Sequence, residues 1–308
     1  MVGLTTEERA AIVLAGGDGA RLKGLVRSMT GQDVPKQFCS LLGEETLLGR
    51  TRRRVALAVE AKHTLFVVNQ AHEPYYAPIL RGVRKSNLVI QPDNRGTAPA
   101  MLLALMRLAA MVPDSSVAIF PSDQFVSDER EFMRHVEIAF DAVNARPELT
   151  VLLGMEPSHP DVSYAWIEPI ERINFEKFSL YRVGGLCEKP LLDEAVRLLK
   201  SGWLWNSKVI IGRASTVLGM IMVAATDLYT AFAPLRAKFP EPPSPRSVAN
   251  VYKNLPLTSF SEHVLTAAPL NLAVLPVSGL RWINLAEPQR IRQTWNQLGL
   301  KPLWSIGS

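Results

Sequence analysis

Short apolar runs alternate along the chain with stretches in which apolar residues recur at helical spacing. The runs are rich in β-branched residues, as is typical of buried strands, and lie at 11–15, 64–69, 88–91, 117–120, 150–154, 165–168, 182–188, 208–212 and 272–276. Helical spacing occurs at 47–60, 98–111, 129–144, 193–201 and 216–232. Thr97 is the predicted N-cap of the second helix, with Pro99 in its first turn. Strands that alternate with helices predict an α/β fold with a mostly parallel sheet covered on both faces.

One segment is rich in residues that interrupt helices and strands. It reads FPEPPSP at 239–245 and is compatible with a linker or with a surface loop. The pattern of strands and helices continues on both sides of it, which favours a loop inside one domain. A chain of 308 residues can form two modest domains or one large α/β domain, and the continuous pattern favours one.

The composition limits the class of partner. With 47% hydrophobic residues the chain can bury a core, and its formal charge of +5 is spread among acidic residues. The densest basic cluster, Arg50 with Arg52, Arg53 and Arg54, falls in the predicted helix 47–60. We interpret it as a solvated helix face rather than a nucleic-acid patch, and expect no nucleic-acid partner. Mild basicity also suits anionic small molecules.

The cysteines, the N-terminal sequence and the lack of a long apolar stretch bear on the cellular compartment. Cys39 and Cys187 match no disulfide or zinc spacing, which fits a reducing environment. The polar start MVGLTTEER does not resemble a secretory signal. The least polar stretch, 217–225, is well short of the roughly 18 residues that a membrane helix needs. We therefore expect a cytoplasmic protein that does not associate with membranes.

The first predicted strand ends in a glycine-rich turn, AIVLAGGDGAR at 11–21. The dinucleotide fingerprint needs a third glycine at the sixth position, which is Leu22 when counted from Gly17. The P-loop needs Gly-Lys-Ser/Thr, but Gly24 is followed by Leu25. Both of these phosphate-binding patterns are therefore excluded.

What remains is the pattern G-G-x-G-x-R, followed by PKQF at 35–38. Bare glycine backbone allows a base and phosphates to approach, and its free N–H groups attract anions. Arg21 and Lys36 would add two positive charges. The alternative is an ordinary glycine turn beside exposed basic residues.

Several motifs together resemble one enzyme family. AIVLAGGDGARL followed by VPKQFCSLLGEETLL resembles the opening of sugar-1-phosphate nucleotidyltransferases, and PKQF resembles their mannose-1-phosphate guanylyltransferase branch. The similarity continues through QPDNRGTAPA (91–100), PSDQF (121–125), SYAWIE (163–168), CEKP (187–190) and GWLWNS (202–207). The resemblance implies a Rossmann-like, three-layer nucleotidyltransferase fold with a mixed, mostly parallel sheet. It implies one domain over 1–308, with a nucleotide-binding half at about 1–150 and a sugar-phosphate half at about 151–308.

The reaction implied by the resemblance joins a sugar 1-phosphate, with mannose favoured, to a nucleoside triphosphate, with GTP favoured. The attacking phosphate is already anionic, so catalysis consists mostly of positioning and charge neutralisation. Arg21 is the candidate for the β- and γ-phosphates, and Lys36 for the phosphates at the reacting centre. The predicted nucleotide-binding residues are completed by Gln91, which would read the base with the glycine backbone, and by Gly16, Gly17 and Gly19.

The resemblance also implies a magnesium site. Asp123 would hold Mg²⁺ against phosphate oxygens, although a helix N-cap is the alternative role for this residue. The family's second carboxylate ligand to the metal is an aspartate, and that position aligns with Asn284, which is neutral.

A second group of residues is implied for the sugar phosphate. Glu188 and Asn206 would bind sugar hydroxyls, Tyr164 and the Ala165 backbone would shape the pocket, and Lys189 would meet the phosphate. For Glu188 and Lys189 the alternative is an exposed salt pair in a turn.

Five positions depart from the family motifs, namely Gly96, Gln124, Ala165, Lys208 and Asn284. Lys208 replaces the glycine after W-N-S, and Gly96 replaces the asparagine of R-N-T. These departures support a second hypothesis, a catalytically weak homologue that binds nucleotide or nucleotide sugar as a regulator. The chain ends soon after Asn284, so we expect no additional isomerase or β-helical domain. The sequence leaves the oligomeric state open, a homodimer included.

Overall fold

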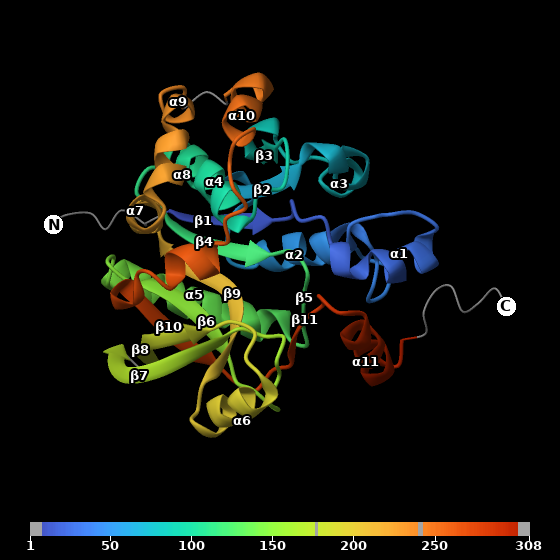
Figure 1. Cartoon of the computed structure of the whole chain (residues 1–308), viewed down its shortest axis with the longest axis vertical. Coiled ribbons are helices and arrows are strands. Elements are labelled where there is room, and N and C mark those ends of the chain that lie inside the picture. The colour runs from blue at the N-terminus through green and yellow to red at the C-terminus, as the bar shows by residue number, and fades with distance from the viewer. Residues whose placement is uncertain (1–7, 176–177, 240–242, 301–308) are drawn as a thin grey trace.

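A nine-stranded sheet forms the centre of the molecule (Figure 1). The computed structural model describes residues 8–175, 178–239 and 243–300. In sheet order the strands are β3 (Leu88–Gln91), β2 (Thr64–Asn69), β1 (Arg9–Leu14), β4 (Ser116–Pro121), β9 (Leu204–Arg213), β6 (Thr150–Met155), β10 (Leu272–Val277), β8 (Phe178–Cys187) and β7 (Trp166–Phe175). A separate two-stranded sheet joins β5 (Gln124–Val126) to β11 (Trp282–Asn284).

Helices cover both faces of the large sheet because its strands are apolar on both sides. In β1, Ala11 and Val13 pack in one core with helices α2 and α5, while Ala10 and Ile12 pack in a second core with α4 and α7. The helices are α1 (Lys23–Thr30), α2 (Leu47–Val55), α3 (Glu73–Ile79), α4 (Thr97–Met111), α5 (Glu129–Ala145), α6 (Leu192–Lys200), α7 (Ala214–Ala224), α8 (Thr226–Ala231), α9 (Ala233–Arg236), α10 (Pro245–Tyr252) and α11 (Pro288–Leu298). The predicted three-layer α/β fold is confirmed.

The sheet changes character between the two halves of the chain. β3, β2, β1 and β4 run parallel, as expected for strands joined by crossover helices. β9 is antiparallel to β4 and β6, and β7 and β8 form a long antiparallel hairpin. The expected mixed sheet is therefore observed, and β9 joins the parallel strands to the second half.

Several boundaries differ from the sequence predictions. Gly96, not Thr97, occupies the N-cap position of α4, because the Thr97 hydroxyl instead accepts a hydrogen bond from the backbone N–H of Phe260 at 2.8 Å. The predicted helix 216–232 is interrupted at Ala225, where the backbone leaves the helical conformation, and 47–60 is helical only to Val55. The predicted loop 239–245 includes residues 240–242, which lie outside the described residues.

The arginine cluster of α2 is not the solvated face that the sequence suggested. Arg54 is buried, where desolvation lowers its pKa to about 10. Arg50 and Arg52 donate to the backbone carbonyls of Leu42 and Ile79, and Arg53 pairs with Glu45 and Glu129. The cluster therefore ties helix α2 to its neighbours.

Two features of the fold bear on the site. The short sheet of β5 and β11 brings a segment near residue 284 beside the end of β4, and α11 follows it directly (Figure 1). No helix in the described ranges combines the length and the apolar character needed to cross a membrane.

Candidate active site

The glycine loop leaves β1 at the carboxyl edge of the parallel strands. Gly19 has a φ of 62°, and a Cβ there would lie 3.1 Å from the backbone nitrogen of Lys36. Gln37 fixes the loop by donating from Nε2 to the carbonyls of Ala15 and Gly17 at 2.9 and 2.6 Å. The loop and the PKQF segment therefore form one unit, as their closeness in sequence suggested.

Gln91 ends β3 and lies directly against this loop. A Cβ at Gly16 would clash with the present position of its amide nitrogen, so the Gln91 side chain would have to move to admit any larger residue there. The Gln91 side chain is buried, and its Oε1 has no hydrogen-bond partner. A buried acceptor without a partner is costly, and an N–H on the edge of a bound base would satisfy it.

Lys36 and Asp123 meet below the glycine loop. The Lys36 ammonium lies 2.6 Å from a carboxylate oxygen of Asp123, and both side chains are mostly buried. Lys36 also donates to the carbonyl of Leu285 at 3.2 Å, and the Leu285 N–H donates to the carbonyl of Asp123 at 3.1 Å. Asp123 precedes a strand rather than a helix, so the N-cap role considered for it is excluded.

Asn284 ends β11 opposite Gln124, the residue that follows Asp123. Its side-chain oxygen is buried and has no hydrogen-bond partner. The carboxylate of Asp123, just before β5, and the unpartnered amide oxygen of Asn284, on β11, therefore belong to neighbouring segments that line the same cavity. Within the described ranges, no group of three or more His, Cys, Asp and Glu side chains is placed to hold a metal ion. Mg²⁺ is commonly held by one or two carboxylates together with substrate phosphates, so Asp123 fits such an ion and Asn284 would add only a neutral oxygen ligand.

These groups surround one cavity of about 480 Å³. Seven of the predicted site residues line it, namely Gly16, Gly17, Gly19, Lys36, Gln91, Asp123 and Asn284. Asn94, Thr97 and Lys208 line it too, as does the segment 259–263, and sequence reasoning assigned none of these to the nucleotide.

The segment 257–263 reaches the cavity because it crosses the loop after β3. A Cβ on Gly96, whose φ is 91°, would clash with the carbonyl oxygen of Thr258. The N–H of Thr258 donates to the Arg95 carbonyl at 3.0 Å, and the Thr258 carbonyl accepts from Ala98 at 3.0 Å. The glycine at 96, where the family motif has asparagine, was the one sequence signal of this close backbone approach.

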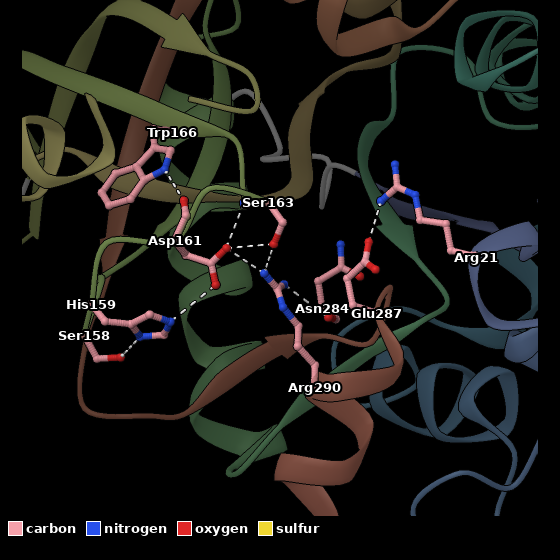
Figure 2. Close-up of polar contacts among 9 residues, drawn as sticks. All are labelled: Arg21, Ser158, His159, Asp161, Ser163, Trp166, Asn284, Glu287 and Arg290. Atoms are coloured by element: carbon pink, nitrogen blue, oxygen red, sulfur yellow. Dashed lines mark hydrogen bonds and ion pairs between the residues drawn. The ribbon is translucent and has the colours of Figure 1, made fainter. Parts of the chain in front are cut away.

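Arg21 is not among the described residues that line this cavity. Its side chain is 60% exposed and pairs with Glu287, at 3.1 Å, beside the first turn of α11 (Figure 2). To reach a triphosphate, the guanidinium would have to exchange this carboxylate for phosphate oxygens.

Asn206 is the most enclosed of the predicted sugar-site residues. It lies in β9, where its backbone N–H donates to the carbonyl of Ala165 at 2.7 Å. Its Oδ1 accepts from the N–H of Lys208 at 2.7 Å, and its buried Nδ2 has no partner. Asn206 is 2% exposed and is not among the described residues that line the cavity.

The remaining sugar-site candidates are spread around Asn206. Tyr164 is buried against Trp205, with ring centroids 4.8 Å apart, and desolvation raises its pKa to about 12. Glu188 pairs with Lys208 rather than with Lys189, which excludes the salt pair considered between neighbours. Lys189 is exposed and has a φ of 50°.

The chain resembles known proteins over most of its length. A family model described as nucleotidyl transferase matches residues 10–222. The chain belongs to the nucleotidyl transferase family. It is 31% identical over 228 residues to the alginate biosynthesis protein AlgA of Pseudomonas aeruginosa, covering 71% of this chain and 44% of that protein. It is also 31% identical over 226 residues to mannose-1-phosphate guanylyltransferase RfbM of Salmonella typhimurium, covering 71% and 45%. The chain thus spans less than half the length of these curated relatives.

Solved structures show the same likeness. A structure titled mannose-1-phosphate geranyltransferase from Thermus thermophilus superposes with a TM-score of 0.78 at 26% identity, covering 91% of this chain and 76% of that one. UDP-glucose pyrophosphorylase complexed with UDP-glucose superposes with a TM-score of 0.56 at 12% identity, over 96% and 99% of the chains, and shows the shared fold. The predicted resemblance to mannose-1-phosphate guanylyltransferases is therefore confirmed. Nucleotidyl transferases generally use a divalent metal ion.

In this nucleotidyl transferase, α11 connects β11 to the segment 161–164 (Figure 2). Arg290 of α11 pairs with Asp161 at 2.7 Å, donates to the Ser163 hydroxyl and lies 3.7 Å above the Tyr164 ring. Burial disfavours the Asp161 carboxylate, but hydrogen bonds from Ser163 and the charge of Arg290 lower its pKa. Sequence reasoning missed Arg290, because its partners lie about 130 residues earlier in the chain.

Proposed function

We propose that the chain transfers a nucleoside monophosphate from a nucleoside triphosphate, with GTP favoured, to a sugar 1-phosphate, with mannose 1-phosphate favoured. A phosphate oxygen of the sugar phosphate forms a bond to the α-phosphorus. The bond from that phosphorus to the bridging oxygen breaks, and pyrophosphate leaves with the electron pair. The decisive support is the single cavity that joins the glycine loop and Gln91 to the Lys36–Asp123 pair and Asn284.

The nucleotide would bind over the glycine loop. The unpartnered Oε1 of Gln91 is placed to accept an N–H from the base, and guanine carries such donors on its Watson–Crick edge. Gly16, Gly17 and Gly19 leave the backbone open to the ribose and phosphates. Arg21 would bind the leaving phosphates after parting from Glu287, which is an exposed partner.

Lys36 would neutralise charge at the reacting phosphate. Its ammonium is held by Asp123 and by the Leu285 carbonyl, so it is oriented before any substrate binds. Asp123 and Asn284 would hold Mg²⁺ together with phosphate oxygens, and the ion would supply further charge neutralisation. No proton has to be removed from the attacking phosphate, so this step needs no general base.

The sugar phosphate would bind on the side of β9. Asn206 would donate from its unpartnered Nδ2 to a sugar hydroxyl, and Glu188 would accept from another. Tyr164 and the Ala165 backbone would shape the wall, and Lys189 would approach the phosphate from the surface. The relatives named mannose-1-phosphate guanylyltransferase support mannose as the first sugar to test.

One observation favours a second candidate function, a homologue that binds nucleotide but turns over slowly. Asn284 offers a dipole where a carboxylate would offer a full charge, so a hard cation should bind more weakly. The cavity retains Gln91 and the glycine loop in either case.

The test is pyrophosphate release with a panel of nucleoside triphosphates and hexose 1-phosphates at several Mg²⁺ concentrations. We expect the fastest release with GTP and mannose 1-phosphate. Tight GTP binding without release from any pair would favour the weak homologue, and neither binding nor release would reject both functions.

Gly17→Val tests the placement of the nucleotide. A Cβ at Gly17 meets no protein atom within 4 Å, so the variant should fold while its branched side chain obstructs the ligand. Gly219→Val in α7 is the matched control, since Gly219 is equally open but does not line the cavity. Calorimetry should show weakened GTP binding only for Gly17→Val, and unchanged binding would move the nucleotide elsewhere.

A further inference from the structure

Lys208 has an unusual backbone conformation for a lysine. Its φ is 60°, in the left-handed region of backbone conformation that residues with a Cβ rarely adopt. The family motif has glycine at this position. Such an outlier persists only where its surroundings hold it in place, and it is a reason to look for a function.

The surroundings of Lys208 do hold it. Its N–H donates to Oδ1 of Asn206 at 2.7 Å, and the preceding carbonyl, of Ser207, accepts from Nε2 of Gln124 at 2.5 Å. Gln124 also accepts from the indole N–H of Trp282, at 3.1 Å. Gln124 follows Asp123 and pairs with Asn284. The turn at Lys208 is therefore hydrogen-bonded to one of the two segments that carry the candidate metal ligands.

The side chain of Lys208 links the two halves of the site. It lines the cavity that also contains Lys36, Asp123 and Asn284. Its ammonium lies 3.3 and 3.4 Å from the two carboxylate oxygens of Glu188, a predicted sugar ligand. The Lys208 side chain is 40% exposed, so it is also accessible to a ligand.

The charge of the cavity differs from what the family motifs imply. Asn284 removes one negative charge and Lys208 adds one positive charge, and both residues line the same space. Both substrates carry phosphates into this space. Lys36 already serves the nucleotide side, beside the glycine loop, whereas Lys208 comes from β9 and contacts Glu188.

We propose that Lys208 binds the phosphate group of the sugar 1-phosphate and makes this chain's recognition of that substrate depend on a lysine absent from the family motif. When the phosphate binds, the ammonium turns from Glu188 to the phosphate oxygens, and the carboxylate becomes free to accept from a sugar hydroxyl. This inference rests on the proposed function, because it assumes a sugar phosphate as the second substrate.

The test is calorimetry without metal, so that no turnover occurs. Mannose 1-phosphate, glucose 1-phosphate, free mannose and GTP are titrated separately into the wild type, Lys208→Met, Lys208→Gly and Lys208→Arg. Lys208→Gly restores the family residue and relieves the left-handed strain, so it keeps the test valid if Lys208→Met folds poorly. Lys200→Met, on the exposed end of α6, is the matched control for loss of one positive charge.

A charge-assisted contact predicts about tenfold or greater loss of sugar-phosphate affinity in Lys208→Met and Lys208→Gly. Lys208→Arg should retain most of the affinity, because it keeps the charge. GTP affinity should change by less than about twofold, as should every affinity of Lys200→Met. In steady state, Lys208→Met should raise KM for the sugar phosphate and leave KM for GTP unchanged.

Wild-type affinity for the sugar phosphates in Lys208→Met and Lys208→Gly would overturn the inference. So would equal losses in Lys200→Met, loss of GTP affinity instead, or no binding of either sugar phosphate to the wild type. Failure of the proposed function is separate, because it would appear as absence of pyrophosphate release from the wild type. Binding that depends on Lys208 would still support the inference in that case.

Discussion

The two halves of the proposed site each contribute a lysine–carboxylate pair, and the pairs differ in length and burial. In the nucleotide half, Lys36 and Asp123 are 2.6 Å apart, with side chains 12% and 21% exposed. In the sugar half, Lys208 and Glu188 are 3.3 Å apart, with side chains 40% and 20% exposed. The first pair is additionally fixed through the Leu285 carbonyl, whereas the second joins the residue after β8 to the middle of β9.

This difference indicates that the two lysine–carboxylate pairs have different roles. A short, enclosed pair keeps its geometry before the substrate arrives, which suits groups that stabilise a developing charge. A longer, more exposed pair is weakened by solvent and salt, so it can exchange one partner for a ligand. The nucleotide half thus resembles a preorganised reaction centre, and the sugar half resembles an adaptable recognition site.

The largest expected effect comes from removing the carboxylate of the enclosed pair. Asp123→Asn should lower kcat by about 100- to 1,000-fold, because it removes charge from the metal position and leaves Lys36 without its partner. Asp141→Asn, which weakens the surface pair with Arg9, is the control. Steady-state kinetics over a Mg²⁺ titration would check this, and activity near the wild-type level would place the reaction centre elsewhere.

The reciprocal change at Asn284 sharpens the same test. Asn284→Asp adds a carboxylate beside Asp123, so the Mg²⁺ concentration for half-maximal activity should fall. An unchanged Mg²⁺ dependence would mean that the Asn284 side chain does not face the metal, despite its unpartnered oxygen.

The next largest effect is expected for the ammonium of the same pair. Lys36→Ala should cost about 1.5–3 kcal/mol of transition-state stabilisation, or roughly 10- to 150-fold in kcat/KM, the range for a lost charge-assisted hydrogen bond. Lys62→Ala is the matched control, because Lys62 forms an exposed pair with Glu60 at 3.1 Å. Equal kinetics for the two variants would remove the distinction between the enclosed pair and a surface pair.

The nucleotide half was more predictable from sequence than the sugar half. Its residues lie at the ends of parallel strands, which meet at one edge of the sheet, so the glycine turn at Gly16 could be located from the strand pattern, whereas Gln91 was identified from the family resemblance. The parallel strands themselves were predicted within a few residues, because each is a continuous apolar run.

Other parts of the site depend on contacts between distant segments. β5 and β11 have three residues each and give no periodic signal, yet they bring Asn284 beside Asp123. Arg290 contacts Asp161 from a helix that the apolar pattern did not predict. The left-handed conformation of Lys208 had one sequence signal, the glycine of the family motif at this position, but its contact with Asn206 appears only in the structure.

A smaller effect, confined to one substrate, is expected at Asn206. Asn206→Ala removes the unpartnered Nδ2 donor and the acceptor that holds the N–H of Lys208. The loss of about 1 kcal/mol for a neutral hydrogen bond predicts a roughly fivefold higher KM for the sugar phosphate, with little change for GTP. Asn271→Ala, on the surface, is the control. A raised KM for GTP alone would mean that Asn206 belongs to the nucleotide half and that its assignment to the sugar half is wrong.

The smallest expected effect concerns Arg21, the most exposed of the three candidate phosphate ligands that pair with a carboxylate. Arg21 pairs with Glu287 at 3.1 Å, and their side chains are 60% and 37% exposed. Because exposed pairs contribute only about 0.2–1 kcal/mol, Glu287→Gln should free Arg21 and tighten GTP binding by at most about fivefold. The gain should shrink as salt is added, since screening weakens both interactions of the guanidinium.

The control for this prediction is Glu148→Gln, which weakens a comparable surface pair with Arg146 at 2.6 Å and should leave GTP affinity unchanged. The double variant Arg21→Ala with Glu287→Gln decides the cause, because the gain requires the guanidinium. If the double variant binds GTP as tightly as Glu287→Gln alone, the effect comes from general charge and Arg21 does not contact the phosphates. If Glu287→Gln instead weakens GTP binding, the Arg21–Glu287 pair serves to orient the glycine loop. In that case the exposed pair of the nucleotide half is preorganised for binding, as the enclosed Lys36–Asp123 pair is.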